Sequence, residues 1–191
     1  MPDDNFTLMR PTLAMLPSYI AALSTGYSPD NLRGRAAAEE QLSRIAADAE
    51  AFVAEMDDPE GRGPPVRLPD GSLAPRLPGV VRWMWDGEFA GSIGLRWQPG
   101  TRDLPPHVLG HIGYSVVPWK QRRGYATRAL ALLLDEARTI GLDQLTITAS
   151  PANAASHKVI LANGGRLLGR FAKPPSLGGG ESLCFGIGLC V

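Results

Sequence analysis

Residues 107–141 constrain the fold of this chain more than any other stretch. They predict a strand over 108–117, a turn with the sequence Gln-Arg-Arg-Gly-Tyr-Ala over 121–126, and an amphipathic helix over 125–140. The first turn of a helix leaves about four backbone N–H groups without partners and carries roughly half a positive charge. An anion such as a phosphate group can therefore bind where this turn enters the helix.

The residue types in the turn suit a phosphate group. Gly124 lets the backbone approach a ligand closely, Ala126 keeps the next position small, and Thr127 offers a hydroxyl group. Arg122 and Arg123 add long-range attraction for an anion. The alternative is an ordinary strand-to-helix turn with solvated arginines, and the turn alone does not decide between the two.

The composition is that of a globular protein and narrows the classes of partner. The chain has 191 residues, 44% of them hydrophobic, and a formal net charge of zero. Because nucleic-acid-binding proteins usually carry a basic excess, we expect no nucleic acid as the main partner. The first residues do not resemble a signal peptide, and the longest apolar run, 129–134, is far shorter than the roughly 20 residues of a membrane helix. These features predict a cytoplasmic protein without membrane contact.

Cysteine and histidine usage supports neither a disulfide nor a metal site. Cys184 and Cys190 are the only cysteines and lie six residues apart in one predicted strand, which separates them by about 20 Å. We expect both to be buried small hydrophobic residues. The sequence has three histidines and no Cys-x-x-Cys pair, and no metal is expected.

The rest of the chain predicts alternating strands and helices. Apolar runs with β-branched or aromatic residues predict strands over residues 6–10, 80–85, 89–98, 145–149, 167–172 and 183–190. Apolar stripes predict helices over residues 11–23, 34–56 and 153–163. Pro17 is expected to kink the first helix, Asp86-Gly87 to form a hairpin and Asn153 to cap the last helix. Segments 57–79 and 173–180, rich in proline and glycine, are predicted loops.

This order of elements resembles the GNAT superfamily of N-acetyltransferases over residues 80–172. The turn 121–126 resembles the family's Q/R-x-x-G-x-G/A signature for acetyl-CoA, and Pro118 precedes it as is common in the family. The helix that begins at Asn153 and its Asn-Gly-Gly ending at 163–165 resemble the family's following helix. The Gly-His-Ile-Gly-Tyr strand resembles a poorly characterised bacterial branch, which indicates no substrate.

The resemblance implies an α/β (α+β) fold with a mixed, twisted central sheet of about six to seven strands flanked by helices. Two parallel strands, one ending at Val117 and one over 145–149, would splay apart and admit the cofactor. The single domain, residues 1–191, would consist of an acceptor side, a cofactor-binding core and a C-terminal loop and strand, at residues 1–79, 80–172 and 173–191.

The activity implied is the transfer of acetyl from acetyl-CoA to the primary amine of a small molecule or peptide by direct attack. The pantetheine arm of the cofactor would pair with the backbone of Val116 and Val117 and reach Asn153, which could instead be a plain helix cap. The residues expected around the pyrophosphate and the arm are Gln121, Arg122, Arg123, Gly124, Tyr125, Ala126, Thr127 and Ser156.

The reaction needs a base for the ammonium group and an acid for the CoA thiolate. His111, with an intrinsic pKa of about 6.5, is the first candidate for the base, although a strand histidine can equally be structural. His107 and Glu88 are weaker candidates for this role. By strand alternation, Tyr114 is expected on the opposite face from His111, unless a bulge at Gly113 changes the alternation.

The usual acid of the family is absent. Many members have a tyrosine seven residues after the asparagine, and here that position is Ile160. Ser156, Tyr114 or water would take its place, or the thiolate would leave without an acid. The absence leaves open a non-catalytic acyl-CoA-binding module. The acceptor cannot be named, because the segments 13–79 and 173–180 carry no recognisable code, and exposed C-terminal strands would allow a homodimer.

Overall fold

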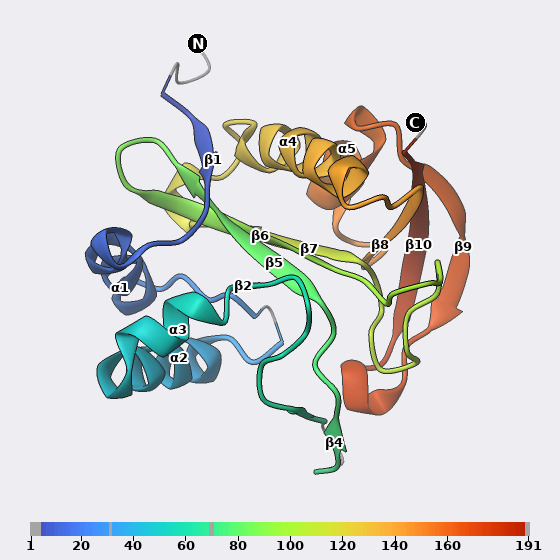
Figure 1. Ribbon diagram of the computed structural model, residues 1–191. Coiled ribbons are helices and arrows are strands. Elements are labelled where there is room, and N and C mark those ends of the chain that lie inside the picture. Colours follow the sequence, from blue (N-terminus) through green and yellow to red (C-terminus); the bar gives the residue numbers. More distant parts are fainter. Residues whose placement is uncertain (1–4, 31, 69–70, 190–191) are drawn as a thin grey trace.

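The computed structural model describes residues 5–30, 32–68 and 71–189 and shows an α+β fold with antiparallel sheets (Figure 1). The first sheet has the order β1-β5-β6-β7, with β2 also paired to β5. Its strands are β1 Thr7–Met9, β2 Asp57–Asp58, β5 Gly79–Trp85, β6 Phe89–Arg96 and β7 Ile112–Val116. The second sheet has the order β8-β10-β9, with strands Gln144–Ala149, Glu181–Gly188 and Arg166–Ala172. A small hairpin joins β3, Val66–Arg67, to β4, Leu73–Ala74.

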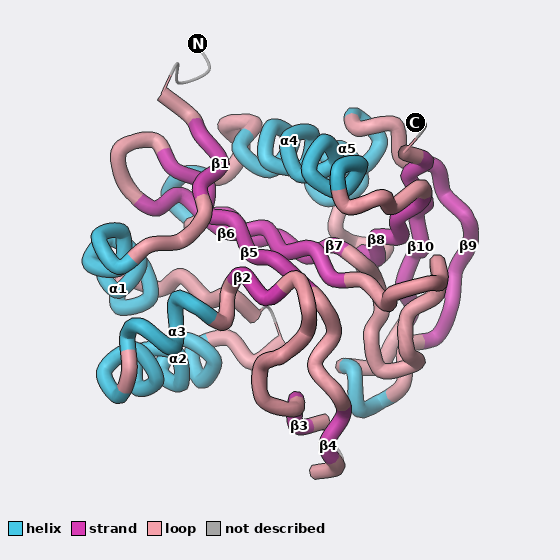
Figure 2. The backbone as a smooth tube through the Cα atoms, in the orientation of Figure 1, coloured by secondary structure: helices cyan, strands magenta, loops and turns pink. Residues whose placement is uncertain are grey.

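Five α-helices are present in the described residues and lie on two sides of the first sheet. They are α1 Leu16–Ser24, α2 Arg35–Ala47, α3 Ala49–Ala54, α4 Tyr125–Thr139 and α5 Ala154–Ala162. Short 3-10 helices are Leu13–Met15, Pro118–Lys120 and Pro175–Leu177. Figures 1 and 2 show α1, α2 and α3 on one side of β5–β6–β7, and α4 and α5 on the other. None of the described helices is long and apolar enough to cross a membrane.

The expected single mixed sheet is instead two antiparallel sheets that meet at one point. The N–H of His111 donates to the carbonyl of Thr146, at 2.8 Å, just before β7 begins. Gly110 lies against β8, where an added Cβ would be 3.1 Å from Thr146 O. The expected strand 108–117 therefore forms only from Ile112, because the preceding residues turn toward β8.

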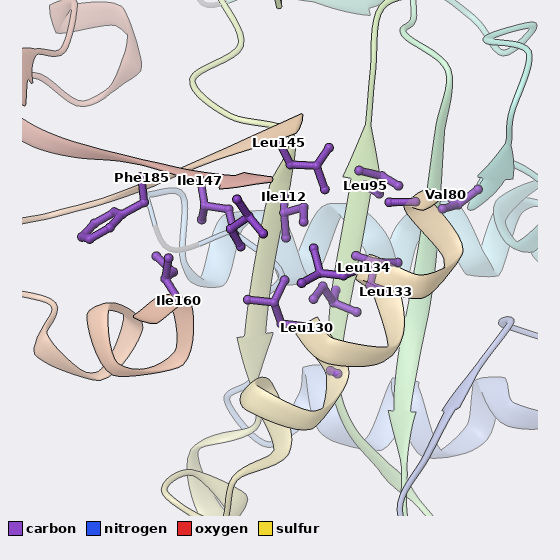
Figure 3. Close-up of a cluster of buried hydrophobic side chains, with 14 of the residues drawn as sticks. Val80, Leu95, Ile112, Leu130, Leu133, Leu134, Leu145, Ile147, Ile160 and Phe185 are labelled. Atoms are coloured by element: carbon purple, nitrogen blue, oxygen red, sulfur yellow. The ribbon is translucent and has the colours of Figure 1, made fainter. Parts of the chain in front are cut away.

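Two apolar cores fill the two sides of the first sheet. One core lies under α4, where Leu130 and Leu133 are fully buried with Ile93 and Leu95 of β6 (Figure 3). The apolar stripe of α4 accounts for this packing. The other core, under α1 to α3, is aromatic and includes Tyr19, whose ring lies 4.6 Å from that of Trp83 between centroids.

Three local expectations were wrong in detail. Pro17 lies in the first turn of α1, where its missing N–H costs little, and does not kink the helix. The single helix expected over 34–56 is interrupted at Asp48, whose carboxylate accepts a hydrogen bond from Ala51 N–H at 2.9 Å and begins a new helix. Cys184 is half-buried rather than buried, and Cys190 lies outside the described residues.

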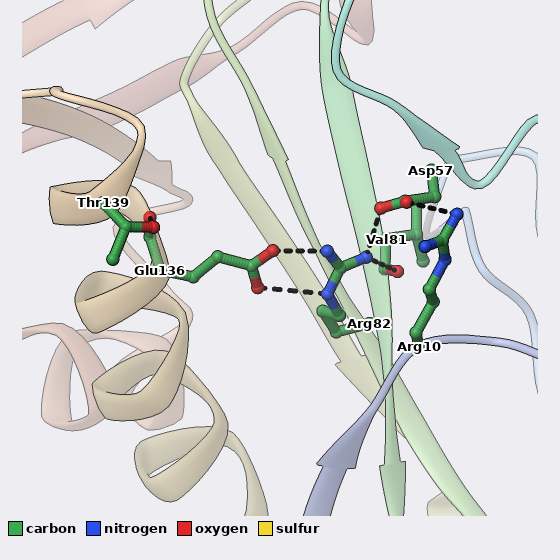
Figure 4. A network of polar contacts seen from close by, with 6 residues as sticks. All are labelled: Arg10, Asp57, Val81, Arg82, Glu136 and Thr139. Carbon is green, nitrogen blue, oxygen red and sulfur yellow. Dashed lines mark hydrogen bonds and ion pairs between the residues drawn. The ribbon is translucent and has the colours of Figure 1, made fainter.

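An ion-pair network connects α4 with strands β5 and β2 of the first sheet (Figure 4). The guanidinium of Arg82 on β5 donates to both carboxylate oxygens of Glu136 on α4, one of them at 3.0 Å. It also donates to Asp57 on β2 at 2.8 Å, and Asp57 accepts a second contact from Arg10 at 2.7 Å. The network fixes α4, and with it the turn that precedes the helix.

Candidate active site

The turn before α4 has the geometry of an anion-binding loop. Arg122 and Gly124 adopt the left-handed conformation, with φ of +62° and +82°. An added Cβ at Gly124 would meet nothing within 4 Å, so backbone conformation alone requires glycine there. Gly124 is the N-cap of α4 and provides no side-chain hydrogen bond to the helix. The N-cap side chain thus occupies none of the first amides of α4, and amides in this position can bind an anion.

A cavity of about 840 Å³, here called the first cavity, opens over this turn. It brings together most of the residues expected to bind the cofactor, namely Val116, Gln121, Arg122, Gly124, Tyr125, Ala126, Thr127, Asn153 and Ser156. It also includes Lys158 of α5, which the sequence did not single out. The mixture of helix amides and basic side chains suits a phosphate-bearing ligand.

Two expected cofactor contacts do not line the first cavity. Val117 is fully buried; its N–H donates to Ala90 O and its carbonyl accepts from Lys120 N–H. Arg123 is exposed and lies outside the cavity lining. Since successive residues of a strand alternate in direction, the backbone of Val116 faces away from β6 and toward the cavity.

Tyr114 and Ser156 come together although they are 42 residues apart in the sequence. Their hydroxyl oxygens lie 2.7 Å apart, one on β7 and the other on α5. Burial raises the pKa of Tyr114 from its ordinary value. The side chain of Asn153 accepts the Ser156 N–H at 3.0 Å, so it caps α5 and aligns the residue that contacts Tyr114.

Ile160 does not point to this site. Its side chain is fully buried in the core beneath α4, seven residues after the cap of α5 (Figure 3). The hydroxyl groups of Tyr114 and Ser156 therefore provide polar chemistry beside the first cavity that position 160 does not. The sequence placed these residues on separate elements and left their distance open.

A second cavity, also about 840 Å³, lies against the side of the sheet that carries α1 to α3. Its lining comes from β5, β6 and β7 and from the loop between α3 and β5, and it includes His107. The two cavities share five residues, Asp30, Tyr114, Ser115, Asn153 and Ser156. A ligand in one cavity can therefore reach a ligand in the other beside Tyr114.

His111 is buried outside the linings of both cavities, with only 2% of its surface exposed. Its Nδ1 accepts a hydrogen bond from Thr146 N–H at 3.0 Å and lies 2.9 Å from Thr146 Oγ1. Burial, and next the charge of Arg96, lower the pKa of His111 below 6.5. These contacts join the two sheets, and the role of His111 as a base stays a prediction.

The other candidate bases lie apart from one another. His107 lines the second cavity and is half-buried. Glu88 is exposed, forms an ion pair with Lys120 at 2.7 Å and lines neither cavity. Among the described residues, no group of three His, Cys, Asp or Glu side chains could hold a metal ion.

A buried ion pair supports the first cavity from below. Lys120 Nζ donates to both oxygens of Asp86, at 2.6 and 2.9 Å, and Tyr125 O–H donates to the same carboxylate at 2.5 Å. Burial acts to raise the pKa of Asp86, but the bonds from Lys120 and Tyr125 outweigh it and the pKa is lowered. The β5–β6 hairpin and the first residue of α4 are thereby held together.

Residues between α1 and α2 also reach the site. Tyr27 is buried, and its hydroxyl lies 2.8 Å from Ser92 Oγ and 2.7 Å from Ser115 Oγ. Tyr27 and Ser28 line the first cavity. No motif marks these residues in the sequence, because their position depends on how α1 and α2 pack on the sheet.

The geometry agrees with a family match. Residues 41–166, more than half of the chain, match the family described as Acetyltransferase (GNAT) domain. The chain belongs to the GNAT family. The description of this family identifies the chain as an acetyltransferase domain. No curated protein matches the sequence significantly.

Solved GNAT structures share the fold at low sequence identity. RimL, a ribosomal L7/L12 alpha-N-protein acetyltransferase in complex with coenzyme A, has a TM-score of 0.63 at 12% identity, covering 98% of this chain and 96% of that chain. RimJ from Mycobacterium smegmatis in complex with CoA-disulfide has a TM-score of 0.62 at 18% identity, and the match covers 98% of this chain and 83% of that chain. The microcin C7 self-immunity acetyltransferase MccE, in complex with acetyl-CoA and AMP, has a TM-score of 0.58 at 15% identity, and the match covers 97% of this chain and 93% of that chain.

Proposed function

We propose that this GNAT acetyltransferase moves the acetyl group of acetyl-CoA directly to a primary amine of a small molecule or peptide. The observation that carries the proposal is the meeting of two cavities at Tyr114, Ser115, Asn153 and Ser156. A donor in the first cavity and an acceptor in the second would have their reacting atoms side by side. Such positioning replaces a bimolecular encounter and lowers the activation free energy of the reaction, by about 7 to 11 kcal/mol in well-oriented cases.

In this proposal the pyrophosphate of acetyl-CoA lies on the amides of Gly124, Tyr125, Ala126 and Thr127. The open N-terminus of α4 and the left-handed turn support this placement. Arg122 and Gln121 line the same cavity, and Arg123 contributes long-range attraction from the surface. Asn153 caps α5 through its carbonyl oxygen, which leaves its amide nitrogen for the pantetheine arm.

The pantetheine arm would pair with Val116 rather than with Val117, whose N–H and carbonyl are both bonded to other backbone groups. The carbonyl of Val116 accepts a hydrogen bond from the side-chain amide of Gln121 at 3.3 Å, which the arm would replace. We place the arm in an opening between β7 and β8, parallel strands that diverge beyond His111. The single junction at His111 and Thr146 and the absence of a β7–β8 ladder among the described strands support this opening.

The chemistry proposed is direct aminolysis of the thioester. The neutral amine attacks the carbonyl carbon, the C–N bond forms, and a strand N–H stabilises the developing oxyanion. The C–S bond then breaks, the CoA thiolate takes a proton from the Tyr114–Ser156 pair, and the proton that the acylated nitrogen loses restores the pair. Tyr114 suits this step because burial raises its pKa and keeps the phenol protonated. His111 stays the predicted base; since its Nδ1 is occupied, it would act through Nε2.

We further propose one functional domain with three parts, as the sequence predicts. Residues 1–79 and the loop 173–180 form the acceptor side, and residues 80–172 hold the cofactor. The lining of the second cavity supports this division, because it draws on Tyr19, Gln41, Glu55 and Leu177 from those segments.

The test measures CoA release by the full-length protein with acetyl-CoA and a panel of amines, amino acids, polyamines and short peptides. We expect at least one amine to accelerate thiol release and to yield its N-acetyl product by mass spectrometry. If acetyl-CoA binds but no amine raises thiol release above hydrolysis, the chain is a non-catalytic acyl-CoA-binding module instead.

A further inference from the structure

Arg96, at the end of β6, is a charged side chain whose contacts the fold leaves incomplete. It lines the second cavity, keeps contact with solvent, and has no hydrogen bond or ion pair from its guanidinium to any described residue. The other formally charged residues of this lining are engaged: Glu55 and Arg76 pair with each other, Asp58 accepts backbone N–H groups, Asp30 accepts two more, and Arg67 donates to a carbonyl.

Arg96 is an exposed residue without an acidic partner among the described residues. The protein near its guanidinium removes part of its hydration, and this lowers the pKa of Arg96. An anion in the second cavity can therefore bind the guanidinium without displacing an existing partner. Arginine matches carboxylate and phosphate oxygens with two parallel hydrogen bonds, which makes an oxyanion the natural partner.

The floor of the cavity brings this guanidinium close to the reaction site. Gly94 of β6 and Gly113 of β7 pair across the strands and present no side chains. The Arg96 guanidinium extends over Gly113, where an added Cβ would lie 3.4 Å from one of its nitrogens. Ser115, which lines both cavities, is two residues further along β7, about 7 Å away along the strand.

We propose that Arg96 forms an oxyanion subsite of the acceptor cavity, so that the enzyme prefers amines carrying a carboxylate or phosphate group about 7 Å from the amine. This inference rests on the proposed function for the placement of the amine beside Tyr114. An amino acid, a phosphorylated amine and an acidic peptide share the required chemistry, and the choice of probes distinguishes them.

The test measures the binding of matched amines by calorimetry in the presence of CoA, without any transfer step. The pairs are 4-aminobutyrate with n-butylamine, 3-aminopropyl phosphate with 3-aminopropanol, and glycyl-aspartyl amide with glycyl-asparaginyl amide. We expect the anionic member of at least one pair to bind ten times more tightly or better. Arg96→Gln should abolish that preference and leave acetyl-CoA affinity unchanged, because Arg96 does not line the first cavity.

The matched control is Arg170→Gln, which removes an exposed arginine that lines neither cavity. It should keep the preference of the wild-type protein. Equal binding of the two members in every pair, or a preference that survives Arg96→Gln, would overturn the subsite. If anionic amines bind through Arg96 but none is acetylated, the proposed function fails and the subsite stands. If amines are acetylated without such a preference, the subsite fails and the proposed function stands.

Discussion

The hydroxyl of Tyr114 lies 2.7 Å from the hydroxyl of Ser156, and this contact joins β7 to α5 where the two cavities meet. Both hydroxyl groups come from residues that the sequence could only place on separate elements. Their contact provides a proton donor near the expected thiolate, in a protein whose position 160 is apolar and buried.

Tyr114→Phe removes the donor and keeps the ring. We expect kcat to fall about ten- to a hundredfold, toward the lower range of acid–base catalysis, because a thiolate is a tolerable leaving group without full protonation. The KM for acetyl-CoA and the melting temperature should change little. Steady-state kinetics with the best amine of the panel measure this effect. Ser156→Ala should lower kcat less, and an unchanged kcat in Tyr114→Phe would remove the pair from the mechanism.

In Gly124→Ala, the alanine must adopt a left-handed backbone conformation, which costs about 1–2 kcal/mol. Its Cβ would meet no neighbouring atom within 4 Å, so the backbone conformation is the source of the strain. We expect acetyl-CoA to bind at least fivefold more weakly, because the strained turn would shift the amides that face the pyrophosphate. Gly141→Ala is the matched control: φ is +87°, the surrounding space is equally open, and the residue lies at the far end of α4. It should lower the melting temperature similarly but leave the affinity unchanged. Equal affinities in the two variants would contradict the anion-binding role of the turn.

The parts of the fold that follow from local chemistry were predictable. The stripe of α4, the cap Asn153 and the hairpin at Asp86-Gly87 each depend on residues close in sequence, and each forms as expected. Asp48 was missed because an apolar stripe continues through it, although aspartate is a common N-cap. The stripe alone does not show where one helix ends and another begins.

The parts of the site that depend on distant residues were not predictable in the same way. The surroundings of Arg96 include Gly113 and the loop between α3 and β5, which lines the same cavity. No local sequence pattern relates these residues to Arg96, so its lack of a partner could not be predicted. His111 was expected on a strand, but Gly110 brings this segment against β8 and turns the imidazole toward Thr146. Only the packing of the two sheets determines these neighbours.

His111→Asn tests the junction of the two sheets. Because the pKa of His111 is lowered in the folded protein, the unfolded chain binds a proton at a higher pH than the folded protein. This group's contribution to stability is therefore complete above about pH 6.5 and is lost as the pH falls toward the lowered value. Thermal unfolding at pH 7.5 and pH 5 should show a larger loss for wild type than for the asparagine variant, which keeps an acceptor for Thr146 N–H but cannot gain a proton.

Equal losses in both proteins would contradict a neutral, buried His111. The same variant also examines the predicted base. If its turnover at pH 8 falls a hundredfold while acetyl-CoA affinity and melting temperature hold, His111 acts in catalysis through Nε2. If turnover follows stability alone, His111 is structural.

Arg82→Gln tests the ion-pair network that fixes α4. The side chain of Arg82 is 13% exposed and that of Asp57 12%, so removing the guanidinium leaves the half-buried carboxylate of Glu136 without this partner and Asp57 with Arg10 alone. We expect the free energy of unfolding to fall by about 2–4 kcal/mol, and the melting temperature by roughly 5–15 °C. Differential scanning calorimetry measures both quantities.

Arg138→Gln is the control for Arg82, since it breaks an exposed pair on the same helix, with side-chain exposures of 41% for Arg138 and 72% for Asp135. Its cost should stay below about 1 kcal/mol because solvent screens the pair. Most of the loss in Arg82→Gln comes from the Glu136 carboxylate, which is left without its partner, so the double change Arg82→Met with Glu136→Leu should recover part of it. If the Arg82 and Arg138 variants are equally stable, the network does not fix α4, and the turn at Gly124 must be held by the Lys120–Asp86 pair instead.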